Sequence, residues 1–185
     1  MSLFPLGLLS QGGGAAAGSF ELISTAVGTG SANTITFSSI PSTYKHLQIR
    51  AVGRSTFANT SMENAAITLN GLTSGYSHHW LTADGSSLSS FGQASQASWQ
   101  YGVAVPQNNQ TASVFSAAII DVLDYQNTNK NKTLRGLLGW HASSRQVQIA
   151  SSMIGTTSAI TSISFALPQG NWTTTSRISL YGIQG

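Results

Sequence analysis

Hydrophobic and polar residues alternate along most of this chain in short segments, as they do in half-buried β-strands. In YKHLQIRAVGR (residues 44–54), Leu47, Ile49 and Ala51 are apolar and the residues between them are polar. Similar segments recur at about the 8–12-residue spacing of sandwiches and barrels. They lie at residues 20–25, 33–40, 65–70, 76–85, 98–105, 113–125, 133–141, 145–153, 160–167 and 176–183. The pattern predicts about ten or eleven strands.

No segment carries a sustained helical stripe. The longest apolar run, residues 113–125, is rich in β-branched residues, which predicts a central strand buried on both faces. Asn70-Gly71 and Asp84-Gly85 predict hairpin turns. We therefore expect an all-β domain over residues 20–185, a two-sheet antiparallel sandwich of jelly-roll-like type preceded by an extended N-terminal arm. The pattern does not define the strand order.

The first 19 residues differ from the rest. Their large apolar side chains are followed by the flexible connector GGGAAAG. The apolar residues of this predicted docking arm are Leu3, Phe4, Leu6, Leu8 and Leu9. Burying them is worth on the order of 7–15 kcal/mol before ordering costs, so we expect the arm to dock on another polypeptide. The competing interpretation is an added edge strand under its own sandwich, which Pro5 and Gly7 disfavour. No Lys or Arg precedes the apolar stretch, so we do not expect a signal peptide.

Charged residues make up only 7% of the 185 residues, and the net charge is +3. Such a surface is polar without being ionic and is insensitive to salt. There is no cysteine, which excludes disulfides, zinc–thiolate sites and thiol nucleophiles. The cluster Lys130, Lys132 and Arg135 is too sparse to predict a nucleic-acid surface; it indicates a solvated loop or a contact with an acidic partner. No apolar run approaches the roughly 20 residues of a membrane span.

The residues that usually carry catalysis are few. Asp121 and Asp124 are the nearest carboxylates, but a separation of three in a strand directs them to opposite faces, which argues against a glycosidase pair. His78 and His79 also face opposite ways. Polar strand positions are therefore favoured over a histidine metal site on a trimer axis. We expect no catalytic residues, no metal and no cofactor.

Aromatic residues offer a different chemistry, because their rings can stack on sugars. The candidates for glycan contact are Tyr76, Trp80 and Trp172, with Asn and Gln neighbours to bind hydroxyl groups. The competing interpretation is that such rings pack in the core or at a subunit contact.

Several stretches resemble a group of small virion proteins of tailed bacteriophages, common among phages of aquatic bacteria. These stretches are FELISTAVG, ITFSSIPSTYKHLQIR, VLDYQNTNKNKTLRGLLG, the ending ITSISFALPQGNWTTTSRISLYGIQG and the LGLLSQGGG start. The resemblance spans nearly the whole chain and lies in strands and turns rather than in a catalytic motif. It implies a β-sandwich oligomer displayed on the virion, and it supplies no active-site residues.

The expected function is that of a capsid decoration (cement) protein, a homotrimer bound through its arm to the major capsid protein. The alternative is a tail fibre or baseplate appendage that binds a tail protein through the arm and a host surface glycan through its loops. A carbohydrate-acting enzyme is a third reading, disfavoured by the few paired carboxylates. No nucleic-acid or membrane partner is expected.

Overall fold

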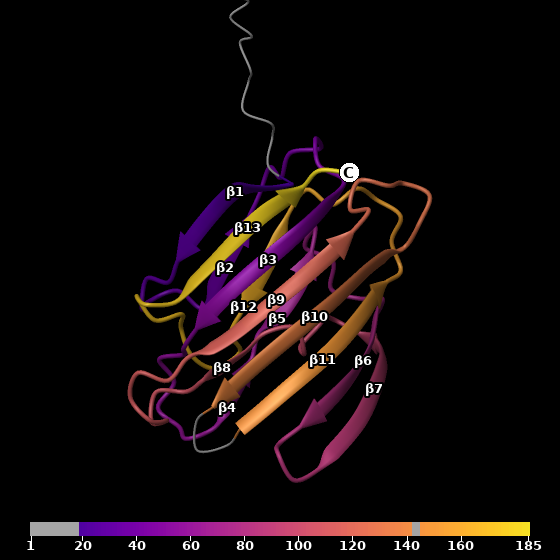
Figure 1. Cartoon of the computed structure of the whole chain (residues 1–185). Coiled ribbons are helices and arrows are strands. Elements are labelled where there is room, and N and C mark those ends of the chain that lie inside the picture. Colours follow the sequence, from indigo (N-terminus) through magenta and orange to yellow (C-terminus); the bar gives the residue numbers. More distant parts are fainter. Residues whose placement is uncertain (1–18, 142–144) are drawn as a thin grey trace, which may run out of the picture.

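The computed structural model describes residues 19–141 and 145–185 (Figure 1). These residues form thirteen strands, all paired antiparallel, joined by turns and loops. Eight form one sheet in the order β1-β13-β3-β9-β10-β11-β6-β7. Their bounds are β1 Phe20–Val27, β3 His46–Gly53, β6 Tyr76–Ala83, β7 Leu88–Gln96, β9 Ser116–Leu123, β10 Lys132–His141, β11 Arg145–Ile154 and β13 Arg177–Ile183. The predicted all-β antiparallel sandwich is confirmed.

Two smaller sheets form the second layer. One has the order β2-β12-β5, and the other pairs β4 with β8. Their bounds are β2 Thr34–Phe37, β4 Met62–Asn64, β5 Ala66–Leu69, β8 Ala104–Pro106 and β12 Ile163–Ala166. Figure 1 shows the large sheet from the side that faces away from the second layer, with β2, β12 and β5 behind it. The layers therefore differ in size, and the core lies between them.

The strand β9 explains how the core is built. It lies in the middle of the large sheet, between β3 and β10. Ile120 and Val122 are buried at 1% and 0% exposure, whereas Ile119 on the opposite face is 44% exposed. The prediction of a central strand is thus right, but burial on both faces is wrong within the chain, because the second layer covers only one side.

The two predicted hairpin turns have different outcomes. Asp84-Gly85 joins β6 to β7, which pair directly, and the Asp84 carboxylate accepts the backbone N–H groups of Ser86 and Ser87 at 2.8 Å. Asn70 and Gly71 both have positive φ, 52° and 68°, as a tight turn requires. However, this turn connects β5 to β6 in different sheets. The hairpin prediction at Asn70-Gly71 is therefore wrong, although the turn itself is present.

Two buried charged side chains organise the loops beside β4 and β8. Glu63 accepts hydrogen bonds from the Ser55 hydroxyl (2.5 Å) and the Gly170 N–H (2.9 Å). Arg54 is 8% exposed, and its guanidinium donates to four backbone carbonyls of the loop after β8. Their oxygens, those of Asn108, Gln110, Thr111 and Val114, lie at 2.8–3.0 Å. Each of these two side chains thus provides a hydrogen-bond partner for loop backbone groups that are not paired within a sheet.

Candidate functional site

The face of the large sheet turned away from the second layer carries a continuous aliphatic surface. Ile119 pairs with Leu137, Leu137 with Ile149, and Ile149 with Leu81, across β9, β10, β11 and β6. Directly paired residues share a face of the sheet, so these side chains form one row. Their exposed fractions are 44%, 50%, 60% and 42% in that order.

A second aliphatic row lies beside the first. Its members pair in sequence from β3 to β7: Val52, Ala117, Gly139, Val147, Ala83 and Leu88. Val52, Val147 and Leu88 are 46%, 51% and 68% exposed. We call these two rows together the apolar face. Single exposed apolar residues are ordinary, but a contiguous set of this size marks an interaction surface.

The row on the other side of Ile119 and Leu137 is polar, and its charges are already paired. Arg135 Nε donates to Asp121 at 3.0 Å, and Gln48 Nε2 donates to the same carboxylate at 2.9 Å. Arg50, next to Ile119, lies 4.8 Å from the ring centre of Tyr181 and 5.6 Å from that of Phe20. The polar row is therefore electrically balanced, whereas Arg50 and the exposed Arg177, which lies opposite Val52, add positive charge at the rim of the apolar face.

The apolar face is hollowed where β11, β6 and β7 meet. An open depression of about 760 Å³ is lined there by residues that include Leu81, Ile149, His79 and Ser151. The His79 ring lies over Gly92, where a Cβ would come within 2.6 Å of it. The lining mixes apolar side chains with uncharged serines, a glutamine and His79, and it holds no carboxylate. Such an open, uncharged surface suits protein contact better than chemistry.

A second candidate is a groove of about 570 Å³ near β4, β6 and β11, lined by aromatic rings and uncharged polar side chains. Trp80 stacks on Tyr101 at 3.6 Å between ring centres and on Phe91 at 5.2 Å. The polar side chains in the lining include Asn64, Gln146 and Gln148. Rings can stack on a sugar and amides can bind its hydroxyl groups, so the lining is compatible with a glycan; we call this the aromatic groove.

The three aromatic residues predicted for glycan contact do not come together. Tyr76 is fully buried, and its hydroxyl accepts the Leu69 N–H at 2.8 Å; burial raises its pKa. Trp172 is also fully buried, and its Nε1 donates to the Phe165 carbonyl at 3.2 Å. These two positions are corrected to core residues, because neither ring reaches the surface. Trp80 alone lies in the aromatic groove.

The predicted docking residues Leu3, Phe4, Leu6, Leu8 and Leu9 lie outside the described residues, so docking by the arm stays a prediction. The described chain starts beside the outermost strand of the large sheet: the Ser19 carbonyl accepts the Gln184 N–H at 3.3 Å, and β1 pairs only with β13 in that sheet. This is the edge farthest from β7.

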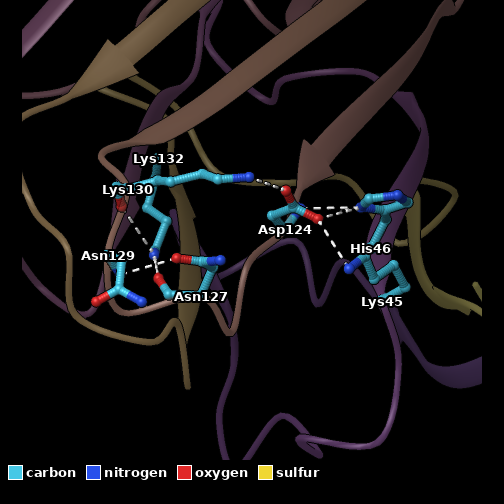
Figure 2. Close-up of polar contacts among 7 residues, drawn as sticks. All are labelled: Lys45, His46, Asp124, Asn127, Asn129, Lys130 and Lys132. Atoms are coloured by element: carbon cyan, nitrogen blue, oxygen red, sulfur yellow. Dashed lines mark hydrogen bonds and ion pairs between the residues drawn. The ribbon is translucent and has the colours of Figure 1, made fainter.

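The fold places the three cationic residues Lys130, Lys132 and Arg135 in different environments. Figure 2 shows Asp124 between Lys130 on one side and Lys45 and His46 on the other. Lys130 Nζ lies 2.9 Å from the Asp124 carboxylate, and the Asp124 N–H donates to His46 Nδ1 at 2.9 Å. Lys132 is buried, so its pKa is lowered, and its ammonium donates to the carbonyls of Asn127, Lys130 and Thr157. Arg135 pairs with Asp121 on the outer face, so no basic stripe forms among the three.

The histidines are also dispersed. His78 is 1% exposed, and its Nε2–H donates to Gln93 Oε1 at 3.1 Å; burial lowers its pKa. His79 lies on the opposite face, as predicted. Over residues 19–141 and 145–185, no three His, Asp or Glu side chains gather closely enough to hold a metal ion. None of the described residues forms a helix long and apolar enough to span a bilayer.

The apolar face was missed in the sequence, although its signal was present. Residues 116–123 are mostly apolar at both alternating positions, a pattern that predicts burial on both faces, but within the chain the face of Ile119 is exposed. Comparison with protein-family models and with curated proteins finds no match. The function is therefore argued from the geometry of these surfaces.

Proposed function

We propose that this protein is a structural component of a tailed-phage virion, a capsid decoration protein that acts by binding rather than by catalysis. The observation that carries the proposal is the apolar face, which extends across the large sheet from β3 through β9, β10, β11 and β6 to β7, in a chain of which only 7% of residues are charged. A soluble domain with such a face gains stability when an assembly covers it. The resemblance to phage virion proteins supports the same role.

The arm and the domain are suited to bind at separate places. The described chain begins at the β1 edge of the large sheet, whereas the aromatic groove and the depression lie toward the β6–β7 edge. Seven strand spacings separate these edges, roughly 34 Å. An arm bound to the major capsid protein would therefore leave the far edge of the domain accessible, and a homotrimer would present three arms together.

The direct test is removal of residues 1–18, which takes away none of the described strands. We expect the truncated protein to keep its circular-dichroism spectrum and thermal transition, and to lose attachment to particles that lack the protein. Quantitative mass spectrometry of purified virions should give hundreds of copies per particle. A truncated protein that attaches as well as the full chain would contradict the role of the arm, and a handful of copies would favour a tail position.

The aromatic groove supports a second candidate, a tail fibre or baseplate appendage that binds a host surface glycan. Phe91 is 50% exposed at the end of the ring stack, and stacking on such a ring does not require charge. Glycan-array binding that is lost in Phe91→Ala and Asn64→Ala, but kept in Thr133→Ala outside the groove, would support this role. An array without any bound glycan would contradict it.

A further inference from the structure

We propose that the apolar face is the surface through which copies of this chain associate with one another. The face consists of two aliphatic rows, one from β9 to β6 and one from β3 to β7, and Leu137 lies at its centre between Ile119 and Ile149. This inference deepens the assembly role proposed above by naming the partner of this surface: a second copy of the same chain.

The first argument is area. The large side chains of the two rows are 42–68% exposed, which together amounts to on the order of 700 Å² of apolar surface, close to the roughly 800 Å² that each partner contributes to a stable interface. The largest apolar patch of an ordinary monomer is only about 300–600 Å². One sheet packed on another at the usual distance of about 10 Å would cover this surface.

The second argument is charge. The charged groups nearest the apolar face are Asp121, held by Arg135 and Gln48, and three arginines at its rim: Arg50, which lies over Tyr181, the exposed Arg177 opposite Val52, and the exposed Arg145 two residues from Val147. The two rows themselves hold no charged side chain, so two copies that meet face to face bury no ion at the centre, and the arginines stay at the rim, where water screens them. A partner with charges at its centre would find no counter-charge within the rows, whereas a second copy needs none. Such an interface is expected to be insensitive to salt.

The third argument is strand composition. Strands buried on both faces are apolar at nearly every position, and β9 has that composition around Ile119 and Ile120. The fold covers only the side of Ile120, while Ile119 stays exposed. A second copy laid over the apolar face would bury β9 on both faces, so that its composition and its environment agree.

The test uses the full chain in solution. Sedimentation velocity and light scattering at micromolar concentration should show an oligomer that is unchanged between 0.1 and 1 M NaCl. Because the same surface on two copies forms a two-fold contact, the apolar face alone gives a dimer, and the trimer of the proposed function needs a further contact. Leu137→Asp should raise the dissociation constant at least about 30-fold, as a central interface substitution does. Thr133→Asp is the matched control, because Thr133 lies on the same face of β10 but outside the two rows. This control should associate like the parent chain.

A second measurement covers the case in which Leu137→Asp does not fold. The chain has no cysteine, so Ile149→Cys and Thr133→Cys each introduce a single thiol. We expect a maleimide to react with the thiol at 149 at least tenfold more slowly in the oligomer than after dilution to monomer, and with the thiol at 133 equally fast in both. A monomer at tens of micromolar, or an oligomer in which position 149 is not protected, would overturn the inference.

The two proposals can fail separately. An oligomer that persists in Leu137→Asp but is lost on removal of residues 1–18 would assign association to the arm and overturn this inference, while the virion role would stand. An oligomer built on the apolar face, from a protein that virions do not contain, would leave this inference standing and remove the proposed function.

Discussion

The indole ring of Trp99 lies against Gly136 in the middle of β10, where an added Cβ would come within 3.2 Å of the ring. Gly136 is paired on both sides, with Ile120 of β9 and Ala150 of β11, so its backbone cannot move away. Trp99 is fully buried. Gly136 has no side chain, and the space this leaves accommodates Trp99, one of the two fully buried tryptophans of the core.

Substitution of Gly136 should therefore destabilise the domain in proportion to the added volume. We expect Gly136→Ala to cost about 1 kcal/mol and Gly136→Val about 3 kcal/mol or more, since overpacking a tight core costs on the order of 1–3 kcal/mol. Urea unfolding followed by tryptophan fluorescence measures both.

Gly139 on the same strand is the control for Gly136. A Cβ there would meet the Gln146 carbonyl oxygen at 3.5 Å, an ordinary contact. Gly139→Ala should leave the free energy of unfolding within about 0.5 kcal/mol of the parent value. Equal losses at positions 136 and 139 would contradict the packing argument.

The alternation of apolar and polar residues predicted the all-β fold and most of its strands, because a strand with one buried face reports that face directly. It missed the short strand β4 and also β7, since LSSFGQASQ holds no β-branched residue and owes its strand conformation to pairing with β6. The sequence pattern also could not show that the turn at Asn70-Gly71 connects strands of two different sheets. Strand order depends on contacts far apart in sequence, which a local pattern does not encode.

The candidate sites were predicted less well than the fold. Trp172 and Tyr76 are candidates for glycan contact in the sequence, with core packing as the competing interpretation, and in the fold both rings turn inward. Nothing local distinguishes a loop tryptophan that stacks on a ligand from one that folds beneath a neighbouring strand. The apolar face was visible in the composition of residues 116–123, but the pattern shows only how many faces are buried and not which chain buries them.

A second prediction concerns Arg54, whose guanidinium bonds four carbonyls of the loop after β8. Arg54→Met removes all four donors and should cost about 3–5 kcal/mol, because buried acceptors are left without partners. Arg54→Lys should recover only part of this loss, since an ammonium lacks the planar fork of the guanidinium.

The measurement for Arg54 is chemical unfolding combined with hydrogen exchange over residues 107–115, where protection should fall first. Arg177→Met, at an exposed arginine, is the control and should change stability by less than about 0.5 kcal/mol. A loop that keeps its protection in Arg54→Met would show that these bonds are not what orders it.

A third prediction concerns pH and His78. Burial lowers the pKa of His78 in the folded chain, whereas the unfolded chain has the ordinary value of about 6.5. Below that value the unfolded state binds the proton more readily. Stability should therefore be unaffected above pH 7 and should fall as the pH drops below about 6.5, with uptake of up to about one proton on unfolding.

His78→Gln removes this titration and should flatten the stability profile between pH 7 and 5. His79→Gln, at the exposed neighbour on the opposite face, is the control and should retain the slope of the parent chain. Thermal unfolding at half-unit pH intervals measures all three proteins. An unchanged slope in His78→Gln would assign the titration to another group.

The last prediction concerns the ion pairs of Asp124 (Figure 2). The hydrogen bond from the Lys130 ammonium holds the pKa of Asp124 below its usual range, and Lys45 and His46 act in the same direction. The stabilisation is therefore present above about pH 4, the ordinary value of the unfolded carboxyl, and is lost as the pH falls through the lower value of the folded chain.

Asp124 has a positive φ of 47°, a conformation that Asn also adopts readily. Asp124→Asn should thus be less stable than the parent chain at pH 7 and nearly equal to it at pH 2.5, and 1 M NaCl should reduce the difference at pH 7. Lys130→Gln should reproduce part of the same loss. A difference between Asp124→Asn and the parent chain that is the same at both pH values would mean that side-chain shape, and not charge, is what position 124 contributes.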